Sequence, residues 1–182
     1  MEKKLILLSC CAPCSVAVIE KLINEGCCFE VVFFNPNIHP ESEYIKRRDE
    51  QKMLCEKFGV EFVELEYAPK QWFEIVKGLE NEPERGKRCF KCFNYRLKRV
   101  MEYAKSLEED VMVSSVLGVS RWKNLAQVND AGKEAETEMG VEYVEIEGRK
   151  GGMQERRNYL IKEFGLYNQE YCGCVYSMRK DK

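Results

Sequence analysis

The stretch LILLSCCAPCS (residues 5–15) predicts a buried strand followed by a loop that carries three cysteines. Four consecutive apolar residues are typical of a strand covered on both faces, as in a parallel sheet. We expect Ser15 to cap the next helix, because apolar residues then recur at helical spacing as far as Gly26. Loops at the carboxyl ends of parallel strands form the usual binding crevice, so a functional site is expected in this loop.

Strands and helices alternate along the rest of the chain. The predicted strands cover residues 29–34, 60–65, 111–117 and 141–146, and the predicted helices cover residues 41–58, 71–79, 90–107, 124–138 and 153–164. This alternation indicates a parallel sheet with right-handed crossovers. The predicted fold class is α/β, a Rossmann-like parallel sheet with helices on both faces, and residues 1–182 are expected to form a single catalytic domain.

Composition excludes several classes of protein. The chain has 182 residues, of which 45% are hydrophobic and 33% charged, as in a globular domain with a sizeable core. No apolar run approaches the roughly 20 residues of a membrane-spanning helix. The N-terminal apolar run is also shorter than the roughly 7–15 residues of a secretory signal, and we therefore expect a cytoplasmic protein without membrane association.

Ten cysteines accompany a single histidine, His39. In a reducing cytoplasm, such cysteines more often bind metal or carry redox chemistry than form disulfides. Seven of them form three close-spaced groups: Cys10, Cys11 and Cys14; Cys89 and Cys92; Cys172 and Cys174. Thiolate-rich sites suit iron–sulfur clusters and zinc. The other three, Cys27, Cys28 and Cys55, lack ligand spacing and are expected to fill the core.

Residue spacing suggests how the seven cysteines divide between metal centres. Cys89 and Cys92 share one face of a predicted helix, whereas adjacent residues in an extended segment, such as Cys10 and Cys11, point opposite ways. A [4Fe–4S] cluster takes four thiolates. The remaining three cysteines could bind a second metal and leave one of its coordination positions open, as in catalytic metal sites. The predicted partition assigns to the cluster Cys89, Cys92, one of Cys10 and Cys11, and one of Cys172 and Cys174. The remaining pair members and Cys14 would hold a mononuclear iron or zinc. The metal site would thus combine the first strand–helix loop, the helix at 85–105 and the C-terminal tail. A pair of structural zinc sites is the alternative.

Basic residues are concentrated locally in a chain of net charge −2. Residues 85–99 contain seven basic residues and no acidic one, which suits phosphate binding but also a solvated helix face. An aromatic residue flanked by cations, and a basic segment before a helix, are weaker signals of the same kind. The candidate RNA-binding residues from these three segments are Lys87, Arg88, Arg96, Arg121, Trp122, Lys123, Arg149 and Lys150.

Seven segments together resemble the QueH-type, cobalamin-independent epoxyqueuosine reductases. They are LSCCAPCS (8–15), FNPNIHP (34–40), Glu43 and Tyr44 with Arg47, RCFKCFNYRL (88–97), SRWKN (120–124), RKGG (149–152) and QEYCGCVYS (169–177), and they occur in the family's order. The resemblance implies a nucleotide-hydrolase-like α/β fold, an iron–sulfur cofactor, and the two-electron reduction of epoxyqueuosine to queuosine at the wobble position of tRNA. It also implies two partners, a tRNA with a queuosine-type anticodon and an electron donor. Asn94 departs from the pattern, because many relatives have Asp there.

Epoxide reduction needs electrons, an acceptor for the developing alkoxide, and protons. A metal held by three thiolates that include Cys14 could act as the Lewis acid. Glu43 and Tyr95 are the candidate proton donors, and Tyr44 and Arg47 are candidate substrate contacts. The Ser-Gly-Gly-x-Asp-Ser phosphate loop of related ATP-using tRNA thiolases is absent, which argues against adenylation. Two other functions stay open, an iron–sulfur electron carrier and a zinc-stapled RNA-binding module without catalysis.

Overall fold

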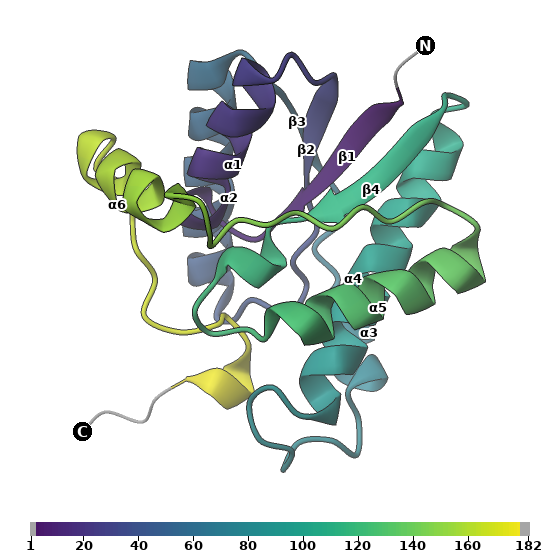
Figure 1. Ribbon diagram of the computed structural model, residues 1–182. Coiled ribbons are helices and arrows are strands. Elements are labelled where there is room, and N and C mark those ends of the chain that lie inside the picture. Colours follow the sequence, from purple (N-terminus) through teal and green to yellow (C-terminus); the bar gives the residue numbers. More distant parts are fainter. Residues whose placement is uncertain (1–2, 179–182) are drawn as a thin grey trace.

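A parallel sheet forms the centre of the computed structural model, which describes residues 3–178 (Figure 1). Its four strands within this range are β1 (Lys4–Ser9), β2 (Phe29–Phe33), β3 (Glu61–Glu64) and β4 (Val111–Ser115), in the order β3-β2-β1-β4. Leu7 of β1 lies opposite Val31 of β2 on one side and Ser114 of β4 on the other. The continuous apolar run of residues 5–8 therefore forms a central strand with partners on both edges.

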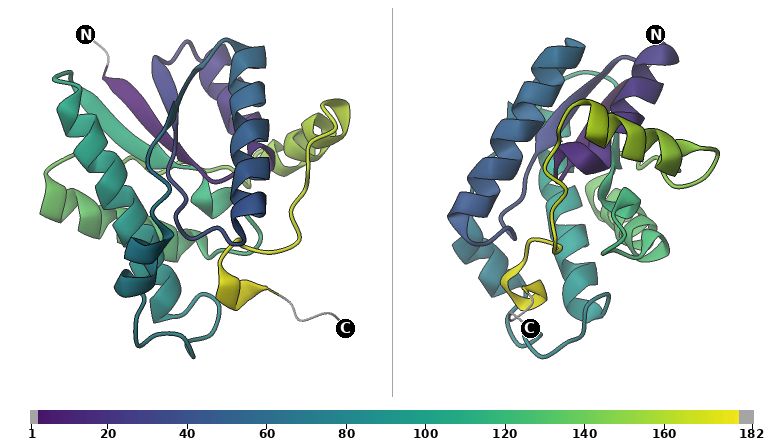
Figure 2. Two further views of the ribbon diagram at one scale, coloured as in Figure 1. Left: turned by 180° about the vertical axis from the view of Figure 1, so that it is seen from behind. Right: turned by 90° about the vertical axis from the view of Figure 1, so that its left-hand side faces the viewer.

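Helices cover both faces of the sheet (Figures 1 and 2). One face carries α1 (Ala12–Asn24), α2 (Glu41–Phe58) and α6 (Met153–Glu163), and the other carries α3 (Pro69–Ile75), α4 (Lys87–Ser106) and α5 (Leu125–Met139). Right-handed crossovers produce this division, because the chain moves from β1 towards β3 in one direction and returns past β1 to β4 in the other. The predicted Rossmann-like α/β class is confirmed.

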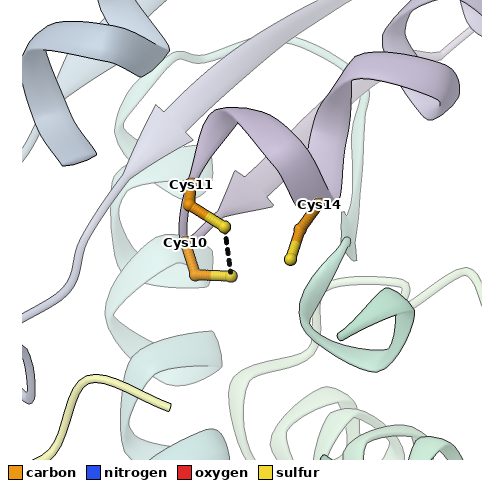
Figure 3. Close-up of side chains that lie close together, drawn as sticks. All are labelled: Cys10, Cys11 and Cys14. Carbon is orange, nitrogen blue, oxygen red and sulfur yellow. Dashed lines mark hydrogen bonds between the residues drawn. The ribbon is translucent and has the colours of Figure 1, made fainter. Parts of the chain in front are cut away.

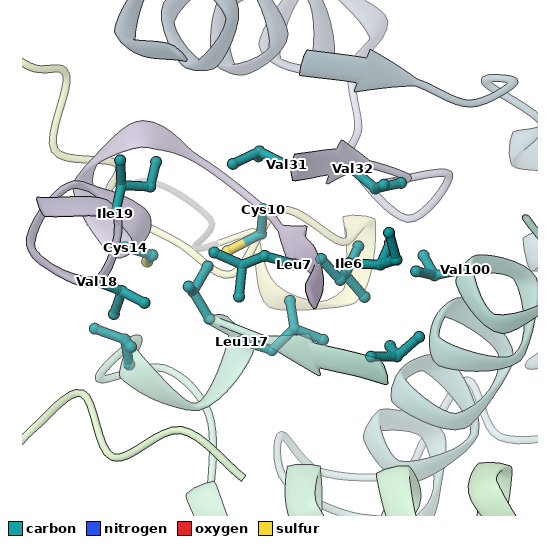
Figure 4. Close-up of a cluster of buried hydrophobic side chains, with 14 of the residues drawn as sticks. Ile6, Leu7, Cys10, Cys14, Val18, Ile19, Val31, Val32, Val100 and Leu117 are labelled. Carbon is teal, nitrogen blue, oxygen red and sulfur yellow. The ribbon is translucent and has the colours of Figure 1, made fainter. Parts of the chain in front are cut away.

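The core lies on both sides of β1. Figure 4 shows Leu7 on the side of the sheet that carries Ile19 of α1, and Ile6 on the side that carries Val100 of α4. All four side chains are fully buried. Because side chains alternate along β1, the strand contributes to two apolar layers. One layer is covered by α1 and the other by α4.

Two local predictions are wrong. The expected strand at residues 141–146 is reduced to one bridge between Val113 and Tyr143. After this bridge the chain leaves the sheet edge and enters the loop of Arg149. The guanidinium of Arg149 donates to the carbonyl oxygens of Ser120 and Lys123 and so holds that loop away from the sheet. Ser15 does not cap α1. That helix begins at Ala12 with a proline in its first turn, and the Ser15 hydroxyl bonds the Ala12 carbonyl oxygen instead.

The cysteines without ligand spacing do not share one environment. Cys55 is fully buried in the core, as predicted, but Cys27 and Cys28 are exposed. They lie in the turn between α1 and β2, at the amino ends of the strands, whereas the cysteine-bearing loop lies at the carboxyl ends. Turns of this kind run over the protein surface. No helix within residues 3–178 is long and apolar enough to cross a membrane.

Candidate metal centre

Cys10, Cys11 and Cys14 form one compact group, called here the cysteine triad (Figure 3). Their Sγ atoms all lie within 4.8 Å of one another, and all three side chains are buried. Cys10 follows β1, Cys11 is the N-cap residue of α1 and Cys14 lies in its first turn. The expectation that Cys10 and Cys11 point opposite ways is wrong. The turn from strand into helix brings their Sγ atoms to 3.7 Å.

The thiols of the triad depend strongly on one another. Burial raises the pKa of Cys11, and a hydrogen bond with Cys10 raises the pKa of Cys14 to about 12. Hydrogen bonds from Cys11 and Cys14 instead lower the pKa of Cys10. Three buried thiols in contact cannot all ionise without a cation to compensate their charge, and thiol ligands must be deprotonated to bind a metal. The donor set and its burial therefore fit a thiophilic metal ion.

Two polar side chains approach the triad from other parts of the chain. Gln169 is buried and its Nε2 atom donates to the Sγ atom of Cys11. The Nζ atom of Lys123 lies 3.9 Å from the Sγ atom of Cys10, and the residue is only 3% exposed. Burial opposes the charge of Lys123, but the nearby Cys10, Cys172 and Cys14 raise its pKa. Lys123 therefore brings a buried ammonium group to the triad, where it lies beside Cys10.

The other four grouped cysteines line a second cavity. Cys89 and Cys92 lie on α4. The C-terminal tail, here residues 169–178, brings Cys172 and Cys174 to the same cavity. Figures 1 and 2 show the tail beside the loop that leads into α4. The structure thus groups the seven cysteines as three and four, whereas the sequence predicted that both centres would draw on the first loop and the tail. The cavity holds about 10 Å³, room for no more than a water molecule.

Arg47 fixes the path of the tail. Its guanidinium donates to the carbonyl oxygens of Cys172 and Tyr171, and it pairs with Glu43 at 2.7 Å. The backbone N–H of His39 donates to the carbonyl oxygen of Gly173. Arg47 is 1% exposed. These contacts of Arg47 position the backbone that carries the tail cysteines. A contact between Arg47 and the substrate stays a prediction.

Two buried arginines line the four-cysteine cavity without a carboxylate partner among the described residues. Arg96 donates to the carbonyl oxygen of Phe34 and to the Asn35 side chain, and its Nη1 atom has no partner. Arg88 donates from Nη1 to backbone carbonyl oxygens in residues 79–82, and its Nε atom has none. A buried charge without a counter-charge is costly. Thiolate-bound metal in this cavity would carry the missing negative charge, so the surroundings fit such a group.

The two candidate proton donors take part in contacts away from the triad. Glu43 accepts from Arg47 and from the Tyr167 hydroxyl. The Tyr95 hydroxyl donates to Oε1 of Gln71 at 3.0 Å. Tyr44 was predicted to contact the substrate, and its hydroxyl donates to Glu64. The structure therefore accounts for these side chains by packing and hydrogen bonding within the protein.

Residues 85–99 do not form one exposed basic face. Arg88 and Arg96 are buried, Lys98 pairs with Glu138 at 2.6 Å, and Arg99 pairs with Glu66. Lys87 and Lys91 are exposed and make no ion pair with a described residue. Helical periodicity explains the difference, because the buried face of α4 recurs at intervals that include positions 88 and 96.

The loop at residues 120–124 links the basic candidates to the triad. Arg121 is exposed, with its guanidinium 4.7 Å from the centre of the Trp122 ring, while Lys123 points inward to the cysteines. Arg149 holds this loop through the two carbonyl oxygens already described, and Lys150 is exposed. The sequence analysis missed Gln169. It lies in the motif at 169–177, but a lone glutamine carries no signal of metal chemistry.

Comparison with known proteins places these features in a family. The family model described as Epoxyqueuosine reductase QueH matches residues 5–180. The chain is 45% identical to the epoxyqueuosine reductase QueH of Acinetobacter baylyi over 97% of this chain and 81% of that protein. It is 45% identical to that of Histophilus somni (98% and 73%) and 34% identical to that of Thermotoga maritima (95% and 90%).

A solved structure shares the fold. The predicted subunit of a tRNA methyltransferase from Methanocaldococcus jannaschii superposes with a TM-score of 0.55, covering 90% of this chain and 89% of that one, at 10% identity. At this identity the likeness concerns the fold alone. The sequence relatives carry the stronger conclusion, since the match spans nearly the whole chain. The chain therefore belongs to the QueH family of epoxyqueuosine reductases.

Proposed function

We propose that this protein reduces epoxyqueuosine to queuosine at the wobble position of a tRNA with a queuosine-type anticodon. The observation that carries the proposal is the presence of two cysteine groups, one of three and one of four residues, in a member of this family. The reaction consumes two electrons and two protons, releases the epoxide oxygen as water and leaves a carbon–carbon double bond. It needs a separate electron donor. A tRNA substrate and many reduced thiols both suit the cytoplasm.

The four-cysteine cavity is the proposed site of a [4Fe–4S] cluster, held by Cys89, Cys92, Cys172 and Cys174. Four thiolates are the ligand set of such a cluster, and Arg88 and Arg96 supply buried positive charge beside it. The cavity of about 10 Å³ is too small for a cluster, so the cysteine side chains that line it would have to turn to admit one. The hydrogen bonds from Arg47 and His39 hold the tail without involving the thiols of Cys172 and Cys174.

The cysteine triad is the proposed site of a mononuclear iron or zinc. Three thiolates leave an open position, which distinguishes a catalytic metal from a structural one. When bound, the cluster would supply electrons and the second metal a Lewis-acid site. Lys123 lies beside Cys10 of this site, and its positive charge would stabilise negative charge on a leaving oxygen bound there. Gln169 orients Cys11 through its amide.

The candidates that reach the surface are the proposed contacts with tRNA. Lys87, Arg121 and Lys150 are exposed and can meet backbone phosphates, and the partly buried Trp122 can stack on an unpaired base. Arg149 positions the loop of Trp122 and need not touch the substrate. Glu43 and Tyr95 remain the candidate proton donors, provided that their present partners release them when tRNA binds.

A turnover assay tests the proposal. Anaerobically prepared protein is mixed with tRNA that contains epoxyqueuosine and with a chemical reductant, and the nucleosides are then identified by mass spectrometry. We expect queuosine with the parent and with Cys55→Ser, a buried cysteine outside both groups, but none with Cys14→Ser. A brown protein that transfers electrons but never produces queuosine would instead be an electron carrier. A colourless protein that binds zinc and RNA would be a zinc-stapled binding module.

A further inference from the structure

A separate cavity of about 240 Å³ lies beside the loop at residues 119–121. Helix α6 and the segment that leads to the C-terminal tail form its other walls. Its lining residues are Val119, Arg121, Gln154, Arg157, Asn158 and Asn168. The lining offers two guanidinium groups and three side-chain amides, and it contains no carboxylate. Such a lining suits an anion that accepts several hydrogen bonds.

Arg157 has no acidic partner among the residues that the structure describes. Its Nη1 and Nη2 atoms donate to the neutral side chains of Asn158 and Asn168 at 3.2 and 3.3 Å. Its Nε atom is buried without a partner. The neighbouring Arg156 differs, because it is paired with Glu20 through two bonds of 2.6 and 2.7 Å. The charge of Arg157 is therefore held in place but left uncompensated.

Arg121 supplies the second uncompensated charge. Its side chain is exposed and lies over the Trp122 ring, and the structure gives it no ion pair within residues 3–178. The backbone carbonyl oxygen of Arg121 accepts from Arg85, which holds the main chain of the loop. Two arginines on different elements thus line one cavity, and guanidinium groups suit the oxygens of a phosphate.

The cavity shares two chain segments with the cysteine triad. Asn168 immediately precedes Gln169, whose amide bonds the Sγ atom of Cys11. Arg121 lies two residues before Lys123, whose Nζ atom is near Cys10. The cavity and the triad are therefore contacted by residues of the same two segments. A nucleotide that extends from the cavity would reach towards the proposed reaction site.

We propose that this cavity binds a backbone phosphate of the tRNA next to the modified nucleotide. The identity of the ligand as RNA rests on the proposed function, whereas the preference for a phosphate rests on the lining. A volume of about 240 Å³ is several times the roughly 30 Å³ that a water molecule occupies in the liquid, so a phosphate and part of its ribose can enter. The substrate would then contact Gln154, Arg157 and Asn158. The sequence pattern around these three residues does not indicate nucleic-acid binding.

Titration of tRNA binding against salt tests the assignment, with the holoenzyme and Arg157→Gln. Loss of one charge-assisted phosphate contact should weaken binding roughly tenfold. It should also reduce the slope of log affinity against log salt by about 0.7, the value for a contact with a single strand. Arg156→Gln is the matched control, because it removes the same charge one residue away from a side chain already paired with Glu20. Its affinity and slope should stay close to those of the parent.

A second variant asks whether both arginines hold the same phosphate. Arg121→Gln alone should also weaken binding, and the Arg121→Gln/Arg157→Gln double variant should lose less than the sum of the two single losses. Equal tRNA affinity and slope for the parent and Arg157→Gln would overturn the assignment. If inorganic phosphate binds the parent but not Arg157→Gln, while tRNA affinity is unchanged, the cavity is a free-phosphate site and the assignment to tRNA is wrong.

These outcomes are distinct from a failure of the proposed function. A parent protein that neither binds tRNA nor converts epoxyqueuosine would overturn both proposals. A parent that converts the substrate, and whose Arg157→Gln variant binds tRNA as tightly, overturns the phosphate site alone. Iron content and far-ultraviolet circular dichroism of each variant show whether the metal centres and the fold are intact, and we expect both to be unchanged because Arg157 bonds Asn158 and Asn168.

Discussion

The ammonium group of Lys123 lies 3.9 Å from the Sγ atom of Cys10 in a position that is almost closed to solvent. A buried ammonium beside a thiol stabilises the thiolate that a metal requires. Lys123 therefore supplies a buried positive charge to the triad. This relationship was not visible in the sequence, where Lys123 was a candidate RNA contact.

Replacing Lys123 by Met should weaken metal binding at the triad. The substitution keeps the length of the side chain but removes the charge, and loss of a neighbour that supports metal ligands typically costs about 10–100-fold in metal affinity. Anaerobic metal titration followed by elemental analysis measures the effect. Lys87→Met, at an exposed position, is the control and should bind metal as the parent does. Equal metal affinity in Lys123→Met would show that the ammonium has no role in holding the metal.

Arg96→Gln should make the proposed cluster harder to form and harder to reduce. Arg96 is fully buried, lacks a carboxylate partner and lines the four-cysteine cavity, so its loss removes positive charge that would stabilise an added electron. Iron and sulfide content, and a redox titration followed by electron paramagnetic resonance, should show lower occupancy and a lower potential. Arg99→Gln, three residues along α4 and paired with Glu66, should change neither. An unchanged potential in Arg96→Gln would contradict this account.

Cysteine substitutions should separate the two centres. Cys92→Ser should abolish the visible absorption of the cluster, whereas Cys14→Ser should retain much of it and lose the second metal. The reason is that the two side chains lie in different groups of the structure. Cys55→Ser controls for the loss of a buried thiol. Complete loss of cluster absorption in Cys14→Ser, with full occupancy in Cys92→Ser, would exchange the two assignments.

Lys87→Ala and Lys98→Ala should affect tRNA binding unequally. Lys87 is exposed without an ion pair to a described residue, so its loss should lower the salt slope by somewhat under one unit. Lys98 already pairs with Glu138 at 2.6 Å, and its removal should change the slope less. Fluorescence anisotropy at several salt concentrations compares the two. A larger effect at Lys98 would mean that the ion pair opens to tRNA.

Gly132→Ala should destabilise the fold although alanine favours helices. A Cβ atom at this position of α5 would lie 2.3 Å from the ring of Tyr143, which is buried against the sheet edge. Overpacking of this kind costs roughly 1–3 kcal/mol, more than the gain of about 1 kcal/mol in helix propensity. The urea midpoint of unfolding measures the difference. Thr137→Ala, at an exposed position of the same helix, should not be destabilised.

The sequence by itself determined the class of fold and the chemistry of the site. The apolar run at residues 5–8 predicted a buried strand, and the loop after it was expected at the carboxyl ends of the strands. Cysteine spacing then indicated thiophilic metals, because ligand type depends on composition. Family membership followed from motifs whose order is a property of the chain alone.

Only the tertiary structure decided how those residues are shared. The path of the C-terminal tail, held by Arg47, brings Cys172 and Cys174 to α4 instead of to the first loop. Packing against the sheet turned Arg88, Arg96 and Lys123 inward, and the sheet edge accepted one bridge where the pattern of residues 141–146 predicted a strand. Spacing constrains neighbours along one element. Which elements meet, and which charges become buried, depends on contacts between distant segments that local patterns do not encode.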